Sequence, residues 1–448
     1  MKAIKFNLPV AFFLGRCRNP VLHVALAYAL LFPTIGFGQV KSDERGPAFN
    51  EAVLTGSRVR VSFENVGSGL ITKSSRPDGD GTVAAVLSGF QLRLAKGEWM
   101  PARARIIGPN KVDLSHPEVL RPAAVRYVED KDLERANLFN KDGLPAVGFA
   151  ADQLPRVEHQ WKKRKYDEAV PTPTYSKISY GEHARNVLDF WKAESNQPTP
   201  LVVVIHGGGW NAGNKEMIDK FVDTNDLLEA GISVAAINYR LMKHCRKLEP
   251  PVSGPLYDAA RSIQFLRTKA DQWNIDISRI AATGGSAGAC SSLWVAYHDD
   301  LADPDNADPV LRESSRLACV APSRGQTTLD PQQMKEWIPN SKYGAHAFGL
   351  KSFETFLAQR ESIAPWIKEY SPYSLLTEDD PPTYMYYPIV PVGGKPEKDP
   401  THSASFGVGL QERCQELGVT SELYYPGAPD AVHQTATDYL ISQLRNER

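Results

Sequence analysis

The chain has 448 residues, of which 42% are hydrophobic and 23% are charged, and its formal net charge at pH 7 is −1. This length allows two domains with sizeable cores. The balanced charge argues against nucleic acid or an anionic membrane surface as a partner. No zinc-type spacing of Cys and His stands out. The oligomeric state stays open.

The first 38 residues have the pattern of an export signal. Basic residues occur up to Arg18, an uncharged stretch follows at residues 21–37, and small residues precede Gln39. An uncleaved membrane anchor is the alternative, but it would need about 20 apolar residues, and Pro33 favours cleavage. We therefore predict a signal peptide over residues 1–38, a periplasmic or secreted protein, and no stable membrane insertion after cleavage.

Four cysteines follow this segment: Cys245, Cys290, Cys319 and Cys414. Export permits disulfides, but four cysteines allow three pairings, and the sequence does not select one. Cys290 lies one helical turn beyond Ser286, where we expect it to serve packing.

Residues 40–152 are predicted to form an all-β sandwich domain. Val59, Val61 and Phe63 alternate with polar residues, which is the period of a half-buried strand. Further short β-like runs separated by turn residues indicate an antiparallel sandwich. The charged, proline-bearing residues 153–174 are predicted to be a linker, with a basic patch that binds a polyanion as the alternative.

Residues 175–448 alternate between predicted strands and helices. Strands are expected at residues 201–205, 232–237, 280–283, 317–320, 383–387 and 422–425, with helices between them. Such alternation is typical of a mostly parallel sheet flanked by helices. A helical, aromatic-bearing insert at residues 326–370 interrupts the pattern, and we interpret it as a lid over the site.

Two glycine-rich motifs carry the chemistry. Gly-Gly-Ser-Ala-Gly at residues 284–288 follows a predicted strand and is a G-x-S-x-G nucleophile elbow, which exposes the Ser286 hydroxyl on a tight strand-to-helix turn. His-Gly-Gly-Gly-Trp at residues 206–210 follows another strand. Its glycines free backbone N–H groups for an oxyanion. The predicted oxyanion hole comprises Gly207, Gly208, Gly209 and Ala287.

A serine nucleophile needs a base, and the base needs an orienting carboxylate. His433 follows the last predicted strand and precedes a C-terminal helix, so it is the predicted base. Asp399 follows the strand 383–387 and is the predicted acid, with Glu397 as its rival. His402 is close to Asp399 in sequence, and we interpret it as a helix-start residue.

These motifs resemble the α/β-hydrolase carboxylesterases of the hormone-sensitive-lipase and bacterial feruloyl/acetyl-esterase type. The similarity covers about residues 173–448 and includes Asn-Tyr-Arg-Leu at residues 238–241. The resemblance implies an α/β-hydrolase fold, Ser286 as nucleophile, His433 as base and Asp399 as acid. It implies no metal and no organic cofactor.

Residues 45–152 are similar to the C-terminal β-domain of sialate O-acetylesterases. The similarity lies in the segments 59–63, 67–70, 122–127 and 137–146. In that family the catalytic serine belongs to a different, SGNH-type domain. The resemblance therefore implies only a β-domain and, as a hint, acylated sugars as substrates.

The sequence thus predicts an exported serine esterase that removes short acyl groups, above all acetyl, from carbohydrates. One alternative keeps the chemistry and changes the substrate: a general short-chain or aryl esterase, or a peptidase or formamidase of the same fold. A non-catalytic glycan-binding protein is the alternative of another class. The Ser, His, Asp and glycine set argues against that last hypothesis.

Overall fold

The computed structural model describes residues 45–55, 58–73, 86–116, 118–119, 121–128, 136–155 and 165–445. The predicted signal peptide lies outside these residues, as does part of the predicted linker. Residues 45–448 form one compact unit, so independence of the two predicted domains stays a prediction. No helix among the described residues is long and apolar enough to cross a membrane.

The N-terminal part consists of antiparallel β-sheets, in keeping with the expected all-β fold, while its existence as a separate domain stays a prediction. One four-stranded sheet has the order β1-β2-β7-β6, another has the order β10-β8-β4-β5, and β3 pairs with β9. The strands are β1 (Ala48–Thr55), β2 (Arg58–Glu64), β3 (Leu70–Thr72), β4 (Phe90–Arg93), β5 (Met100–Pro101), β6 (Arg103–Gly108), β7 (Lys111–Ser115), β8 (Ala124–Tyr127), β9 (Leu138–Asn140) and β10 (Phe149–Asp152).

The two sheets bury one shared apolar cluster. Val59, Val61 and Phe63 of β2 enter it together with Phe90 of β4 and Tyr127 of β8. Arg58 and Arg60 alternate with the buried β2 residues and are only partly buried. The period-two pattern of the sequence therefore selects which face of β2 is buried.

The C-terminal part contains one eight-stranded sheet of order β11-β12-β14-β13-β15-β16-β17-β18. Strands β11 and β12 join antiparallel, β12 pairs antiparallel with β14, and all later neighbours pair in parallel. The strands are β11 (Tyr175–Ser179), β12 (Val187–Trp191), β13 (Thr199–Ile205), β14 (Ser233–Ile237), β15 (Ile275–Gly285), β16 (Cys319–Ser323), β17 (Thr383–Tyr386) and β18 (Ser421–Tyr424).

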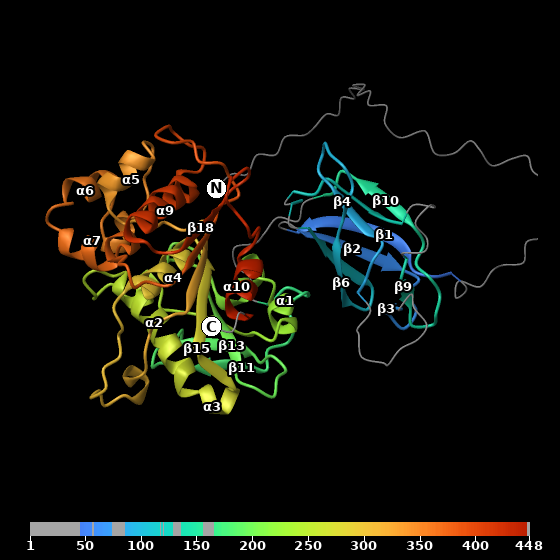
Figure 1. Ribbon diagram of the computed structural model, residues 1–448, viewed down its shortest axis with the longest axis horizontal. Helices are drawn as coiled ribbons and strands as arrows, with labels where there is room; N and C mark the ends of the chain where they lie inside the picture. The colour runs from blue at the N-terminus through green and yellow to red at the C-terminus, as the bar shows by residue number, and fades with distance from the viewer. Residues whose placement is uncertain are drawn as a thin grey trace, which may run out of the picture. The chain divides into compact units, whose positions relative to one another are not determined.

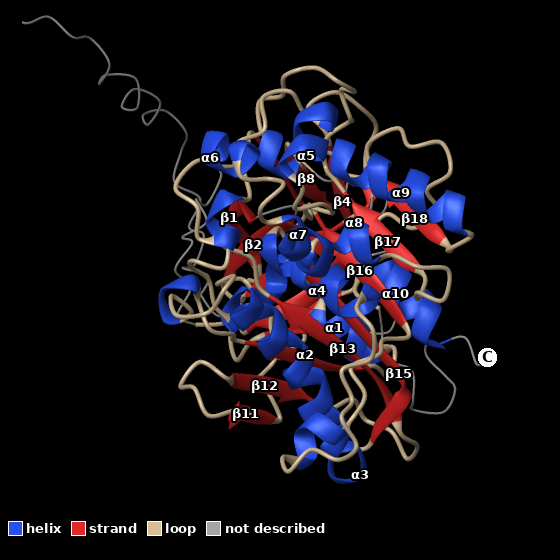
Figure 2. Ribbon diagram, turned by 90° about the vertical axis from the view of Figure 1, so that its left-hand side faces the viewer, coloured by secondary structure: helices blue, strands red, loops and turns tan. Residues whose placement is uncertain are grey.

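Helices follow most of these strands, and with the elbow after β15 they give the α/β-hydrolase arrangement (Figures 1 and 2). Figure 1 also shows α5, α6 and α7 gathered at one end of the sheet, near α9. The α-helices are α1 (Thr224–Glu229), α2 (Ser253–Thr268), α3 (Ala270–Trp273), α4 (Ala287–Tyr297), α5 (Pro331–Trp337), α6 (Phe353–Ala358), α7 (Ala364–Tyr370), α8 (Pro372–Leu375), α9 (Ser405–Leu417) and α10 (Ala436–Arg445).

Strand β13 shows why the sheet needs helices on both faces. Leu201, Val203 and Ile205 enter the cluster that contains α2, α4 and α9. Val202 and Val204 enter the opposite cluster, which contains α1 and α10. A strand that carries apolar residues on both faces is stable only when both faces are covered.

The parallel register brings the two glycine motifs together. Ile205, the last residue of β13, lies opposite Gly284 of β15. A Cβ on Gly284 would lie 2.2 Å from the Ile205 carbonyl oxygen, and one on Gly288 would lie 2.1 Å from the same atom. Only glycine allows the elbow to pack this closely on β13.

We predict that Gly288→Ala destabilises the protein, although alanine is about 1 kcal/mol more favourable than glycine inside a helix. The new methyl group would overlap the Ile205 carbonyl, so a net loss on the order of 1–3 kcal/mol is expected. The measurement is the free energy of unfolding in urea. Gly108→Ala is the matched control, because a Cβ there meets nothing within 4 Å, and it should change the value by less than about 0.5 kcal/mol. Equal stability of both variants would contradict the close approach.

Candidate active site

Ser286 sits between β15 and α4 in a backbone conformation that non-glycine residues rarely adopt. Its φ is 54° and its ψ is −122°. The turn is fixed on both sides, because the Ser286 N–H donates to the Ser323 carbonyl at 3.0 Å and the Ser286 carbonyl accepts from the Cys290 N–H at 2.9 Å. Such strain costs about 1–3 kcal/mol and is stored at functional sites. The side chain remains partly exposed.

The glycine loop after β13 lies directly against this elbow. A Cβ on Gly207 would lie 2.5 Å from the Gly285 carbonyl oxygen and 3.4 Å from Ser286 Cβ. Gly208 and Gly209 have φ values of 110° and 60°. Ala287 is the first residue of α4, and the first N–H groups of a helix have no acceptor within the helix. The predicted oxyanion donors thus lie on the two segments that meet at Ser286.

His402 is the histidine that the structure places at Ser286. Its Nε2 lies 3.1 Å from the Ser286 hydroxyl, and its Nδ1 lies 2.9 Å from Asp399 Oδ2. Because a carboxylate only accepts, Nδ1 carries the proton that is donated to Asp399. Nε2 is then free to accept the hydroxyl proton of Ser286.

A short turn between β17 and α9 supplies both partners. Residues Pro400–His402 form the 3-10 helix η7, which puts Asp399 and His402 on the same side at a spacing of three residues. The fully buried Gln326 side chain donates to the Thr401 carbonyl and so anchors this turn next to β16. The interpretation of His402 as a helix-start residue therefore missed its contact with the serine.

Glu397, the rival acid, contacts no histidine in the part of the chain that the structure describes. Its carboxylate accepts from the hydroxyls of Ser403 at 2.5 Å and Ser405 at 3.3 Å. The Asn340 side chain donates to its carbonyl at 2.8 Å. These contacts brace the start of α9.

The structure does not bring His433, the predicted base, to Ser286. Its Nδ1 lies 2.7 Å from Glu422 Oε2, and the same carboxylate accepts from the His433 backbone N–H. Glu422 lies opposite Tyr384, two residues before the end of β18, and Tyr384 donates its hydroxyl to the His433 carbonyl. His433 is thus held by side chains of β17 and β18.

The insert predicted as a lid reaches the glycine loop. The 3-10 helix η6 (Ala345–Phe348) carries His346, whose Nε2 would lie 3.7 Å from a Cβ on Gly209. Burial lowers the pKa of His346, so the imidazole stays neutral at neutral pH. The insert therefore brings a neutral histidine close to Gly209 of the glycine loop, and its role as a lid stays a prediction.

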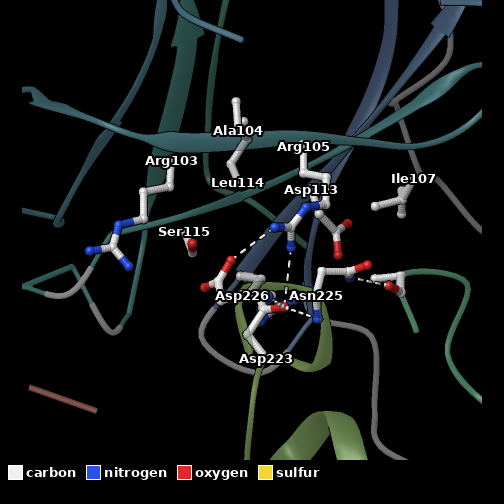
Figure 3. A pocket seen from close by; sticks show the side chains of 12 residues that line it. Arg103, Ala104, Arg105, Ile107, Asp113, Leu114, Ser115, Asp223, Asn225 and Asp226 are labelled. Carbon is white, nitrogen blue, oxygen red and sulfur yellow. Dashed lines mark hydrogen bonds and ion pairs between the residues drawn. The ribbon is translucent and has the colours of Figure 1, made fainter. Parts of the chain in front are cut away.

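A cavity of about 60 Å³ elsewhere in the molecule is lined by charged, polar and apolar side chains, and several of the charged ones form ion pairs (Figure 3). Arg105 of β6 contacts Asp223 at 3.1 Å, Asp226 at 2.9 Å and Glu229 at 2.7 Å. Although burial opposes it, these carboxylates raise the pKa of Arg105. The cavity contains none of the residues around Ser286, so we interpret the network as structural.

No group of three or more His, Cys, Asp or Glu side chains among the described residues is arranged to hold a metal ion. Cys245, Cys290 and Cys414 carry free, buried thiols. Burial raises the pKa of the Cys290 thiol far above its usual range. Its predicted packing role agrees with a position in the cluster beneath α4.

Comparison with known proteins places the C-terminal part among esterase-like sequences. Residues 188–388 match the family model described as BD-FAE. The chain is 35% identical over 152 residues to "Probable carboxylic ester hydrolase LipM" of Mycobacterium tuberculosis, covering 33% of each protein. It is 30% identical over 163 residues to kynurenine formamidase of Debaryomyces hansenii, covering 36% of this chain and 51% of that protein.

The chain spans from a third to just over half of the length of these curated relatives. Among solved structures, the truncated form of a carbohydrate esterase from gut microbiota aligns with a TM-score of 0.47 and 18% identity. That alignment covers 63% of this chain and 100% of the other chain.

We predict that Asp399→Asn lowers kcat for an ester substrate by roughly 10⁴, because the imidazole of His402 loses the acceptor that fixes its tautomer. Glu397→Gln is the matched control, since it changes a nearby carboxylate that accepts from the hydroxyls of Ser403 and Ser405. Steady-state kinetics of both purified variants tests this. A large loss in Glu397→Gln with normal activity in Asp399→Asn would reverse the assignment.

Proposed function

We propose that the protein is a serine hydrolase of carboxylic esters, with Ser286 as nucleophile, His402 as general base and Asp399 as the acid that orients it. The observation that carries this proposal is the continuous chain of contacts from Asp399 through His402 to the hydroxyl of Ser286, at 2.9 and 3.1 Å. The carboxylic ester hydrolase and esterase names of several relatives support the same chemistry.

The proposed reaction has two halves. Ser286 attacks the ester carbonyl while His402 Nε2 accepts its proton, and the protonated imidazole then gives the proton to the departing alcohol. Water activated by His402 hydrolyses the acyl-enzyme and restores the serine. The negative oxygen of each tetrahedral intermediate is stabilised by N–H groups of Gly207–Gly209 and Ala287.

The proposed substrates are short acyl esters, above all acetyl esters, of carbohydrates. The resemblance of residues 45–152 to a β-domain of sialate O-acetylesterases supports a sugar substrate. We further propose that residues 1–38 direct export, which would expose the enzyme to extracellular or periplasmic polysaccharide. The formamidase among the relatives makes an N-formyl amide the second substrate class to test.

We predict that the protein hydrolyses 4-nitrophenyl acetate and that Ser286→Ala lowers kcat by about 10⁶, as expected for loss of a triad nucleophile. Acetate release from acetylated polysaccharides and formate release from N-formylkynurenine are measured beside it. Ser292→Ala serves as the control serine variant and should keep its activity, because the Ser292 hydroxyl lies inside α4 and donates to the Ala289 backbone carbonyl at 2.9 Å.

Activity above about one per cent in Ser286→Ala would remove this residue from the mechanism. If only the formamide is hydrolysed, the proposed substrate class is wrong. If no substrate of any class is hydrolysed, the non-catalytic alternative is favoured.

A further inference from the structure

Arg185 is a half-buried cation that contacts no carboxylate. It lies in the loop between β11 and β12, and no ion pair with Asp or Glu is found for it within the described part of the chain. Burial lowers its pKa, but a guanidinium stays charged in proteins. Burying a charge without a charged partner costs free energy. The other contacts of Arg185 must therefore stabilise its charge.

The guanidinium donates its hydrogen bonds to residues of the glycine-loop region and to the backbone beside it. Its Nε donates to the Tyr239 carbonyl at 2.7 Å, and one terminal nitrogen donates to the Gly213 carbonyl at 3.1 Å. The same nitrogen lies 3.2 Å from Nε2 of His206. Gly213 in turn packs on the loop, because a Cβ there would lie 2.4 Å from the Gly207 carbonyl oxygen.

These contacts fix the tautomer of His206. Burial lowers the pKa of His206 to about 3, so the ring is neutral at neutral pH. Arg185 can only donate, so Nε2 of His206 must be the acceptor, and the single ring proton sits on Nδ1. Nδ1 lies 2.7 Å from the Gly207 carbonyl oxygen, to which it therefore donates.

The Gly207 carbonyl belongs to the same peptide plane as the Gly208 N–H. In a trans peptide these two groups point in opposite directions and rotate together. A hydrogen bond that holds the carbonyl therefore also aims the N–H, which is one of the proposed oxyanion donors. The positive charge on Arg185 polarises the imidazole, and such chains strengthen each successive hydrogen bond.

We infer that Arg185 is a positioning residue for the oxyanion hole, acting through neutral His206 on the peptide plane between Gly207 and Gly208. The inference deepens the proposed esterase function and rests on it for its kinetic consequence. On this inference, half-buried Arg185 acts in the transition state, when the carbonyl oxygen of the ester becomes negative. Binding of the ester before the reaction depends little on Arg185.

The kinetic test compares Arg185→Met with Arg185→Lys and Arg261→Met. Arg261 is the control, because it is also a half-buried arginine that holds this loop, donating to the Tyr180 carbonyl at 2.9 Å. Its ion pair is with Asp308, at 2.7 Å, and not with the glycine loop. Removing one oxyanion donor costs about 10²–10³ in kcat, so misaiming one should cost about 10- to 100-fold. We expect this loss in Arg185→Met with KM for 4-nitrophenyl acetate changed less than about threefold.

A trifluoromethyl ketone separates positioning from a merely structural role. It forms a hemiketal oxyanion on the serine, so its Ki should rise in Arg185→Met by the same factor by which kcat falls. Arg185→Lys should recover part of both losses. If Ki is unchanged while kcat falls, or if Arg261→Met behaves like Arg185→Met, the inference is overturned.

A readout independent of esterase activity is the ¹⁵N NMR spectrum of the histidine-labelled protein, with His206 assigned by His206→Asn. The inference requires the Nδ1–H tautomer in the wild type and a changed Nε2 shift in Arg185→Met. A wild-type proton on Nε2 overturns it whether or not the protein hydrolyses esters. A wild type with the expected tautomer but no esterase activity instead refutes the proposed function.

Discussion

The contact between two glycine-rich turns is the constraint on which the rest of the site depends. Strands β13 and β15 are parallel neighbours, and both end at the same edge of the sheet. Their turns approach so closely that Gly207, Gly284 and Gly288 have no room for a side chain. This approach places the backbone donors of one turn beside the serine of the other, and no flexible side chain has to be ordered to achieve it.

The contact between the two turns is stabilised by the structure around it. Ser286 adopts a backbone conformation with a positive φ of 54°, and the strain persists because neighbouring strands and α4 fix both ends of the turn. Trp210, at the end of the glycine loop, donates its indole N–H to Ser291 of α4 at 3.0 Å. The glycine loop and the helix of the nucleophile are therefore tied together a second time, one turn below the serine.

The sequence was sufficient to predict the parts of the structure that depend on local pattern. The apolar run before each glycine motif predicted the strands, and the glycines predicted the tight turns, because both follow from the chemistry of short segments. The alternating residues of β2 likewise predicted a β-domain. The roles of Ser286, Asp399 and the oxyanion glycines stay predictions, although the structure brings these residues to one place.

The choice of histidine could not be made from local pattern. His433 has the expected place in the chain order, after the last strand. However, the carboxylate of Glu422 on β18 binds the backbone N–H groups of Val432 and His433 and the imidazole of His433, and these contacts set the direction of the loop. The position of His402 favours a helix-start role in the sequence, yet a single 3-10 turn suffices to align its side chain with that of Asp399. The sequence does not predict a role for Arg185, because that role depends on two backbone carbonyls and one imidazole that come together only in the fold.

The account depends most on His402 being the base that serves Ser286. The direct measurement is the rate at which paraoxon modifies Ser286, followed by intact mass, in His402→Ala and His433→Ala. Phosphorylation of the serine needs the base but no substrate recognition. We predict that His402→Ala slows the reaction by at least about 10³ and that His433→Ala reacts within about threefold of the wild type. Normal modification of His402→Ala together with loss in His433→Ala would contradict the account.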